Sequence, residues 1–211
     1  EGLLKLAEHK CQKNDTIVFT MSNTNLQELY SKKVKNSPNV SFSQIKPITN
    51  SNSFLITRVV ELFYFAFWLL FKFIMHRPNL VYVATNPPIL VPFFVALYCI
   101  MFKKKYIYHR QDIHPESASL IVNFSSPIKK IILLIDNFTI SRASELITLT
   151  DEMKLSILNR KCKKPRINII SNPGLNLGLK VKNKKHGFVF CGNAGRLQMM
   201  NILLPAIKKY L

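Results

Sequence analysis

The sequence predicts an α/β fold in which parallel strands alternate with helices. Short apolar runs of strand length alternate with longer segments whose apolar residues recur at helical spacing. Strands separated by helices stack as βαβ units on a mostly parallel sheet. The chain has 211 residues, 48% of them hydrophobic, which is enough to bury the core of one large domain or of one and a half.

The predicted elements follow the periodicity along the chain. Strands are expected at 16–20, 80–85, 106–108, 145–149, 166–170 and 187–191. Helices are expected at 1–13, 54–75, 88–102, 127–142 and 152–161, and from 199 onward. Residues 31–53 are rich in Lys, Asn, Ser and Pro, so mainly irregular structure is expected there. Asp151 is expected to cap helix 152–161.

Two apolar runs could be taken for membrane spans. The run at 88–102 is too short for a bilayer, which requires ~20 apolar residues, and the run at 54–75 is interrupted by Arg58, Glu61 and Lys72. Helices packed on a parallel sheet are often this apolar, so burial is favoured over spanning. Aromatic faces beside lysine clusters also leave room for shallow binding at a membrane surface.

The charge of the chain limits the classes of partner. A formal net charge of +19 predicts attraction to anions such as nucleic acid, anionic lipid or phosphate-bearing substrates. The lysines lie in scattered clusters without the interleaved aromatic residues of a stacking platform, so nucleic acid is not the expected partner. The four cysteines form no Cys-x-x-Cys pair and the five histidines have no metal-ligand spacing, which favours a reducing cytoplasm and predicts no metal site.

Acidic residues are few, so the carboxylates that follow a strand are informative. Asp112 and Glu116 come after strand 106–108, and ligands of open α/β sheets bind beyond the carboxyl ends of strands. A carboxylate there could take a proton from an attacking hydroxyl. On spacing alone it is equally plausible that Asp112 caps the next helix. His109 and His114, on either side, are interpreted as polar loop residues, and Asp136 as part of a solvated helix face.

A glycine turn lies between strand 187–191 and the helix from 199. Gly192 and Gly195 would let a phosphate approach the backbone at a helix N-terminus, and Arg196 could clamp it in two-pronged fashion. No glycine occurs between residues 3 and 173, so its use here is selective. An ordinary strand-to-helix turn remains the alternative, since Gly and Asn favour such turns as well.

Five sequence blocks together resemble a known family. In chain order they are Thr85-Asn86-Pro87-Pro88, Arg110-Gln111-Asp112-Ile113-His114-Pro115-Glu116-Ser117-Ala118, Thr148-Leu149-Thr150-Asp151-Glu152-Met153, Ser171-Asn172-Pro173-Gly174 and Gly192-Asn193-Ala194-Gly195-Arg196-Leu197-Gln198. Their order is similar to that in bacterial family 4 glycosyltransferases of surface-polysaccharide and O-antigen synthesis. The resemblance implies a GT-B fold, in which two Rossmann-like domains enclose the active site.

The resemblance also implies an activity. It is the transfer of a sugar from a nucleotide-sugar, expected to be UDP-linked, to a lipid-diphosphate-linked acceptor, with retention of configuration. The acceptor would lie at the anionic inner face of the plasma membrane, and no cofactor or essential metal is expected. Asp112 and Glu116 would be the catalytic residues on the acceptor side of the cleft. Donor binding would fall to the backbone and side chains of Gly192, Asn193, Gly195 and Arg196. The protein is thus expected to be cytoplasmic and peripherally attached to that membrane.

The same resemblance predicts the domain boundaries. Residues 1–173 would form the N-terminal acceptor-side domain without its first strand, 174–186 a linker, and 187–211 the start of a nucleotide-sugar-binding domain. A Glu-x7-Glu element that holds the donor would lie beyond residue 211, so the fragment is expected to be inactive and its parent active. A dinucleotide-binding oxidoreductase fits less well because Gly-x-Gly-x-x-Gly is absent. A non-catalytic membrane-associated subunit remains an open alternative.

Overall fold

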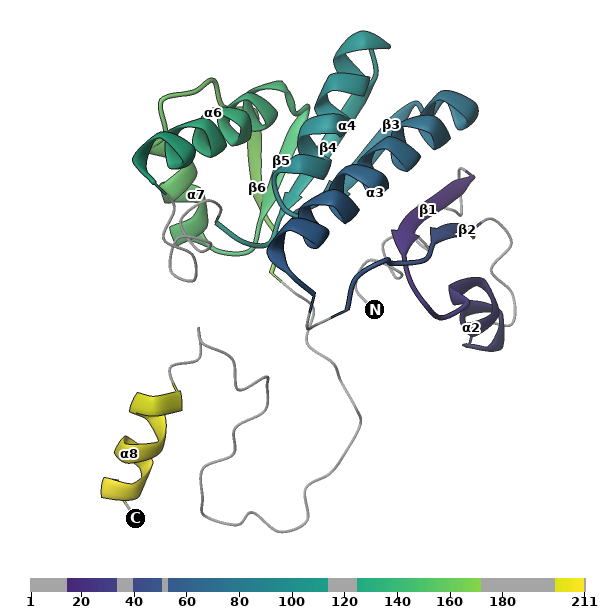
Figure 1. The fold of residues 1–211 in the computed structure, drawn as a ribbon. Coiled ribbons are helices and arrows are strands. Elements are labelled where there is room, and N and C mark those ends of the chain that lie inside the picture. Colours follow the sequence, from purple (N-terminus) through teal and green to yellow (C-terminus); the bar gives the residue numbers. More distant parts are fainter. Residues whose placement is uncertain (1–14, 34–39, 51–52, 114–124, 172–199, 211) are drawn as a thin grey trace.

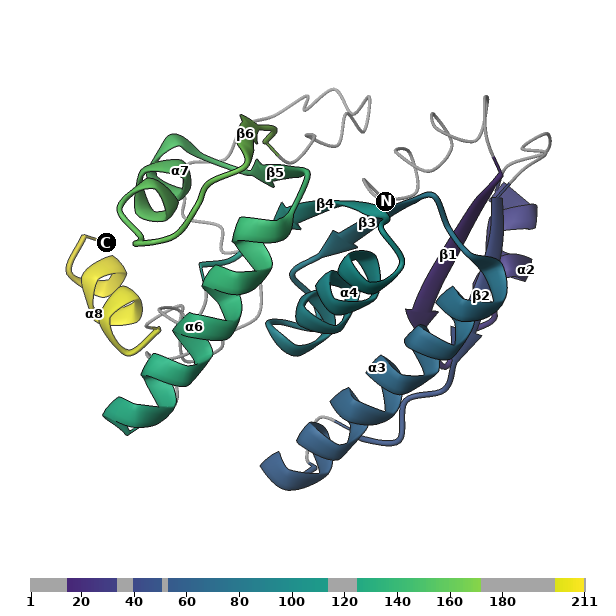
Figure 2. The same cartoon turned by 90° about the horizontal axis from the view of Figure 1, so that it is seen from above.

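The computed structural model describes residues 15–33, 40–50, 53–113, 125–171 and 200–210. Three long helices cover one face of a layer of parallel strands (Figures 1 and 2). The strands are β1 (Thr16–Met21), β2 (Val40–Ile45), β3 (Leu80–Ala84), β4 (Lys105–Arg110), β5 (Glu145–Thr148) and β6 (Arg166–Ile169). The helices are α2 (Leu26–Lys33), α3 (Leu55–His76), α4 (Leu90–Met101), α6 (Ser126–Arg142), α7 (Asp151–Leu158) and α8 (Met200–Tyr210).

The strands form two parallel sheets. β1 pairs with β2 in register from Thr16 opposite Val40 to Met21 opposite Ile45. The second sheet has the order β3-β4-β5-β6, so each strand pairs with its neighbour in the sequence. Because all four strands of this sheet run in the same direction, their carboxyl ends lie along one edge. Within the described residues, no backbone ladder joins β1 to β3.

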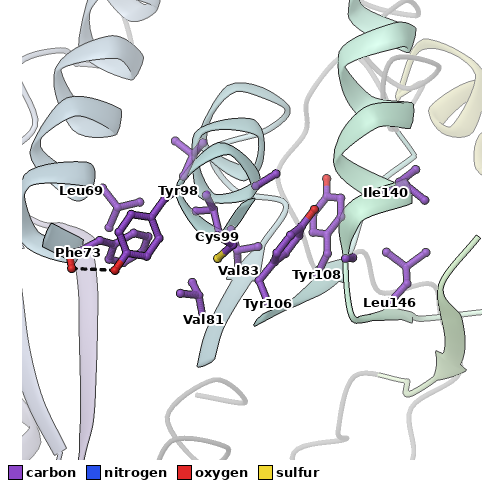
Figure 3. Close-up of a cluster of buried hydrophobic side chains, with 14 of the residues drawn as sticks. Leu69, Phe73, Val81, Val83, Tyr98, Cys99, Tyr106, Tyr108, Ile140 and Leu146 are labelled. Atoms are coloured by element: carbon purple, nitrogen blue, oxygen red, sulfur yellow. Dashed lines mark hydrogen bonds between the residues drawn. The ribbon is translucent and has the colours of Figure 1, made fainter. Parts of the chain in front are cut away.

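The hydrophobic core lies between the second sheet and helices α3, α4 and α6 (Figure 3). Tyr106 and Tyr108 alternate along β4 and both point to the helix layer, as the two-residue period of a strand requires. The Tyr98 hydroxyl on α4 donates a hydrogen bond to the carbonyl of Phe73 on α3 (3.0 Å). A buried tyrosine needs such a partner, and this bond fixes α4 against α3.

Two of the long helices end in the left-handed conformation without glycine. Arg77 follows α3 with φ 46°, and its N–H donates to the Phe73 carbonyl (2.8 Å). Lys103 follows the last turn of α4 with φ 53°. These positions usually hold glycine, and a non-glycine residue there carries a conformational cost. In both cases the residue is a cation near a helix C-terminus, where it interacts favourably with the helix dipole.

The prediction for residues 31–53 is wrong in part. Helix α2 extends into this region and β2 lies within it. Val40 and Phe42 of β2 pack against Tyr30 of α2, with Phe42 and Tyr30 ring centroids 5.3 Å apart. Apolar and polar residues alternate here in the strand manner, and pairing with β1 outweighs the turn-like composition of the segment.

The predicted cap of α7 is also wrong. Thr150, not Asp151, occupies the N-cap position, with extended backbone at φ −140°. Its hydroxyl accepts a hydrogen bond from the Met153 N–H (3.3 Å), while Asp151 is already in the first helical turn. Threonine and aspartate cap helices by the same kind of hydrogen bond, so the sequence alone does not decide between Thr150 and its neighbour Asp151. Asp151 still complements the positive end of the helix.

The expectation that α3 is covered is not met. Its Ile56–His76 segment is long and apolar enough to cross a membrane. Only 22% of the most apolar 18-residue stretch of this segment is buried inside the protein. Phe65, Leu69 and Phe73 face the core, but the opposite face of the helix is exposed. A helix lying on a sheet buries one stripe of its surface, and among the described residues nothing covers the other stripe.

The domain division stays a prediction. The proposed linker and the predicted strand at 187–191 lie outside the described residues, as does the expected helix at 1–13. The helix expected from residue 199 is confirmed as α8, which contains Pro205 in its interior.

Candidate active-site edge of the sheet

The described sequence blocks of the resemblance meet at one edge of the second sheet. Thr85 follows β3, Gln111 and Asp112 follow β4, Thr148 ends β5, and Ser171 comes shortly after β6. The parallel register, in which Ala84 pairs with His109 and Arg110 with Thr148, brings these ends side by side. This is the edge at which open α/β sheets bind ligands.

Thr85 joins the ends of β3 and β4. Its hydroxyl donates to the His109 carbonyl (3.2 Å) and accepts from the Gln111 N–H (2.8 Å), and its own N–H also donates to the His109 carbonyl (3.1 Å). The side chain is 1% exposed. The buried Thr85 hydroxyl therefore restrains the backbone of Gln111, the residue directly before Asp112.

Asp112 lies where the sequence predicts a catalytic carboxylate. It is exposed at the carboxyl end of β4. Arg110 Nε donates a hydrogen bond to the Asp112 backbone carbonyl (3.2 Å). The backbone on both sides of Asp112 is thus restrained, while its side chain is exposed.

The other predicted site residues lie outside the described part of the chain. They are Glu116, Gly192, Asn193, Gly195 and Arg196. Their roles stay predictions.

A buried ion cluster supports the Asp112 loop. Arg110 Nη1 donates to Asp136 Oδ2 on α6 (2.7 Å), and Arg160 Nη1, which follows α7, donates to the same oxygen. Arg110 and Asp136 are 0% and 1% exposed. The interpretation of Asp136 as part of a solvated face is therefore wrong. The α6 register turns its carboxylate towards the sheet, where two guanidinium groups balance its charge.

Sequence reasoning missed this cluster although one signal was present. Tyr106, Tyr108 and Arg110 occupy alternating positions of β4, so all three point to the same face. An arginine continuing a buried aromatic stripe requires an anionic partner, because a lone buried charge is very unfavourable. The partner is 26 residues away, which spacing alone does not identify.

His109 belongs to the sheet and not to the loop, which corrects its interpretation as a polar loop residue. It points to the face opposite Arg110, and the Tyr82 hydroxyl of β3 lies 2.5 Å from its Nδ1. Its Nε2 has no hydrogen-bond partner among the described residues. Burial lowers the pKa of His109 and raises the pKa of Tyr82 to about 12. Both groups are thus neutral at pH 7 and hold β3 to β4.

The buried imidazole predicts a loss of stability in mild acid. The unfolded chain protonates His109 below about pH 6.5, whereas the folded chain resists protonation to lower pH. The free energy of unfolding should therefore fall as pH decreases from about 6.5 to 5.5, by up to ~1.4 kcal/mol per pH unit.

Denaturant titrations across this pH range provide the measurement. His109→Gln should flatten the dependence, and His76→Gln, at an exposed position on α3, should leave it unchanged. An equal slope in wild type and His109→Gln would contradict the assignment of the acid response to His109.

The turn after β3 is strained. Ile89 has φ 60° and ψ −63°. Positive φ is unfavourable for a β-branched residue, and such conformations tend to occur at functional sites. The turn leads directly from Thr85 into α4 and lies beside the Asp112 loop at the same edge of the sheet.

A metal site is not visible within the described residues. No group of three or more His, Cys, Asp or Glu side chains among them lies close enough to hold an ion. The polar groups that the structure describes at this edge are hydroxyls, the exposed acidic residues Asp112, Asp151 and Glu152, and the buried guanidinium of Arg110.

Comparison with known proteins identifies the fold. No family model matches the sequence, and no curated protein matches it. The structure is similar to the crystal structure of Arabidopsis thaliana UGT89C1 complexed with UDP-L-rhamnose, with a TM-score of 0.53 and 14% sequence identity. The similarity covers 84% of this chain and 50% of that one. The fold is α/β of the GT-B type.

This result confirms the predicted fold class and nothing finer. At 14% identity the similarity concerns the fold alone, and the chain spans half the length of the protein that it resembles. Many functions share such folds, so activity has to be argued from the site.

Proposed function

We propose that this chain belongs to a glycosyltransferase that transfers a sugar from a nucleotide-sugar, most simply a UDP-sugar, to a lipid-diphosphate-linked acceptor in the synthesis of a cell-surface polysaccharide. One observation carries the proposal. The described parts of four of the five sequence blocks gather at the carboxyl edge of a sheet whose fold is of the GT-B type. UGT89C1, a protein with this fold, is seen in complex with UDP-L-rhamnose.

The exposed position of Asp112 at the carboxyl end of β4 supports an acceptor-side role for it. Its carboxylate is exposed, while Arg110 and Thr85 restrain the backbone around it. For the configuration to be retained, the acceptor hydroxyl would attack the anomeric carbon from the same face that the diphosphate leaves, and Asp112 would take the hydroxyl proton while the bond from that carbon to the phosphate oxygen breaks. Glu116, four residues later, would act from the same loop.

The donor side of the proposed site rests on the sequence. Gly192, Asn193 and Gly195 would offer backbone N–H groups to the diphosphate at a helix N-terminus, and Arg196 would bind it with its guanidinium. The leaving nucleoside diphosphate gains negative charge during transfer, so these groups would stabilise the transition state more than the ground state. The proposal includes retention of the anomeric configuration.

A transfer assay on the full-length protein tests this function. Radiolabelled UDP-sugars are incubated with protein and with lipid extract from the host, and label in the lipid fraction is measured. We expect transfer from one or a few UDP-sugars, with an anomeric configuration equal to that of the donor by NMR. Arg196→Ala should lower turnover more than donor affinity, and Arg196→Lys should restore only part of it, because an ammonium cannot bind bidentately.

Two outcomes would contradict the proposal. Absence of both transfer and nucleotide-sugar binding in calorimetry would reject a glycosyltransferase. Donor binding without transfer to any lipid would favour a non-catalytic membrane-associated subunit.

A further inference from the structure

We propose that the outer face of α3, α4 and α6 is a docking surface for an anionic bilayer, on which α3 lies in the plane of the membrane. The proposal rests on this surface, and it agrees with the proposed function because a lipid-linked acceptor is presented by a bilayer. It deepens that function by specifying which face of the domain meets the membrane and how deeply.

The outer face of α3 is a continuous apolar stripe. Large apolar side chains recur at steps of three or four residues, which places them on one side of a helix. They are Ile56, Val59, Val60, Phe63, Tyr64, Phe67, Phe71, Ile74 and Met75, each at least 40% exposed. A helix of this length extends ~30 Å, so the stripe is as long as a bilayer core is thick but runs along the protein surface.

The stripe continues onto the neighbouring helices. Phe63 and Phe67 of α3 contact Phe94 of α4, with ring centroids 6.3 and 5.7 Å apart, and Phe93 contacts Phe138 of α6 at 5.8 Å. The three helices lie side by side on the same face of the strands (Figure 2). Further exposed apolar side chains on this layer are Leu97, Ile100, Met101, Phe102, Ile128, Ile131 and Leu134. Exposed apolar patches of this extent usually mark interaction sites.

The charges on this layer are all of one sign. The exposed or half-exposed ionised groups on α3 and α6 and after α4 are basic: Arg58, Lys72, Lys103, Lys104, Lys129, Lys130 and Arg142. The two acidic residues of the three helices are buried in internal bonds, Glu61 to Thr49 and Asp136 to Arg110. A basic rim around an apolar face complements anionic lipid, with ~1 kcal/mol for each Lys or Arg near the surface. A second copy would oppose like charges.

The inner face of α3 opposes a transmembrane arrangement. Glu61 accepts hydrogen bonds from the N–H groups of Ile48 (2.5 Å) and Thr49 (2.8 Å) and from the Thr49 hydroxyl. Phe73 contacts Phe19 of β1, and its carbonyl accepts from Tyr98. Spanning would break these bonds and place Glu61 and Arg58 in hydrocarbon, which is unfavourable. α3 is therefore held to the protein on one side and available to lipid on the other.

Vesicle sedimentation with the 211-residue chain tests the surface. We expect binding to vesicles of phosphatidylcholine with phosphatidylglycerol to be at least tenfold tighter than to phosphatidylcholine alone, and to weaken with salt. Phe67→Gln combined with Phe71→Gln should reduce binding at least tenfold, since each removes an exposed aromatic ring from the stripe. Leu155→Gln combined with Leu158→Gln, which removes exposed leucines from α7, is the matched control and should bind as wild type.

A matched pair of charge reversals tests the basic rim. Lys129→Glu with Lys130→Glu should weaken binding to the anionic vesicles more than Lys161→Glu with Lys163→Glu, which changes the net charge equally at exposed positions after α7, outside α3, α4 and α6. Equal losses would mean that only total charge matters. Circular dichroism and thermal unfolding establish that each variant is folded before binding is compared.

The single tryptophan reports the depth of α3. Trp68 lies on this helix, half-buried against Phe19 of β1 beside the stripe, and brominated lipids quench its fluorescence when bromine is near. An in-plane helix predicts stronger quenching by bromines close to the headgroups than by bromines near the bilayer centre. Absence of binding to anionic vesicles, a reversed quenching order, or sedimentation of a dimer that the stripe variant abolishes would each overturn the proposal. None of these outcomes depends on sugar transfer, so failure here is distinct from failure of the proposed function.

Discussion

Replacing Asp136 with asparagine is expected to reduce the free energy of unfolding by about 3–5 kcal/mol, the usual effect of removing one partner from a buried ion pair. Asp136 Oδ2 accepts from both Arg110 and Arg160, and all three side chains are less than 10% exposed. Asparagine keeps the size of the side chain but leaves two guanidinium groups without that negative charge. Urea or guanidinium titration followed by circular dichroism measures the loss.

Two further variants make this result specific. Asp15→Asn makes the same chemical change at an exposed position and should alter stability by no more than about 0.5 kcal/mol. Adding Arg160→Met to Asp136→Asn should recover part of the loss, because it removes one of the charges that lost its partner. If Asp136→Asn and Asp15→Asn have the same free energy of unfolding, the buried ion cluster contributes little to stability.

Under the proposed function, replacing Asp112 with asparagine is expected to lower the turnover of the full-length protein by about 10²-fold or more, the scale associated with loss of a general base. The change keeps the size of the side chain and removes its ability to accept a proton. Donor affinity should change little, because the predicted diphosphate site involves Gly192 to Arg196. Steady-state transfer rates and calorimetric donor binding give the two measurements.

The position of Asp112 allows an effect on turnover to be separated from an effect on stability. Its carboxylate is exposed, and the contact that restrains the loop uses its backbone carbonyl, which the substitution keeps. Stability should therefore stay within about 0.5 kcal/mol of wild type. Asp15→Asn is again the control and should retain full turnover. Normal turnover in Asp112→Asn would show that this residue has a structural role only.

Local periodicity was sufficient to predict most of the fold. The five apolar strands among the described residues that the sequence predicted, and the long helices, are confirmed within a few residues, because each keeps one period along its length. β2 was missed because Ser, Gln and neighbouring Lys and Asn resemble a loop, and only pairing with β1 decides between the two. The cap of α7 was displaced by one residue because Thr150 and Asp151 are both suitable capping residues.

In the candidate site, the sequence could predict residues whose position follows from the strand before them, but not contacts between residues far apart in the chain. Asp112 could be located because a residue directly after a parallel strand must lie at the ligand-binding edge. Asp136 could not be assigned, since its partners Arg110 and Arg160 are 26 and 24 residues away and the helix register decides whether it faces water or the sheet. The same limit applied to α3, whose composition is that of a covered helix although only 22% of its most apolar stretch is buried.

The break between the two sheets separates the molecule into parts that can open independently. Backbone bonds hold β1 to β2, and a different set holds β3 to β6. The described contacts across the break run through α3: Phe19 of β1 packs against Trp68 and Phe73, and Ile48 and Thr49, after β2, donate hydrogen bonds to Glu61. Cooperative opening follows such boundaries, so we expect the β1–β2 sheet to open more readily than the β3–β6 sheet, whose carboxyl edge holds the candidate site. Robustness of the proposed active site is thus a property of the β3–β6 sheet and does not depend on its neighbour.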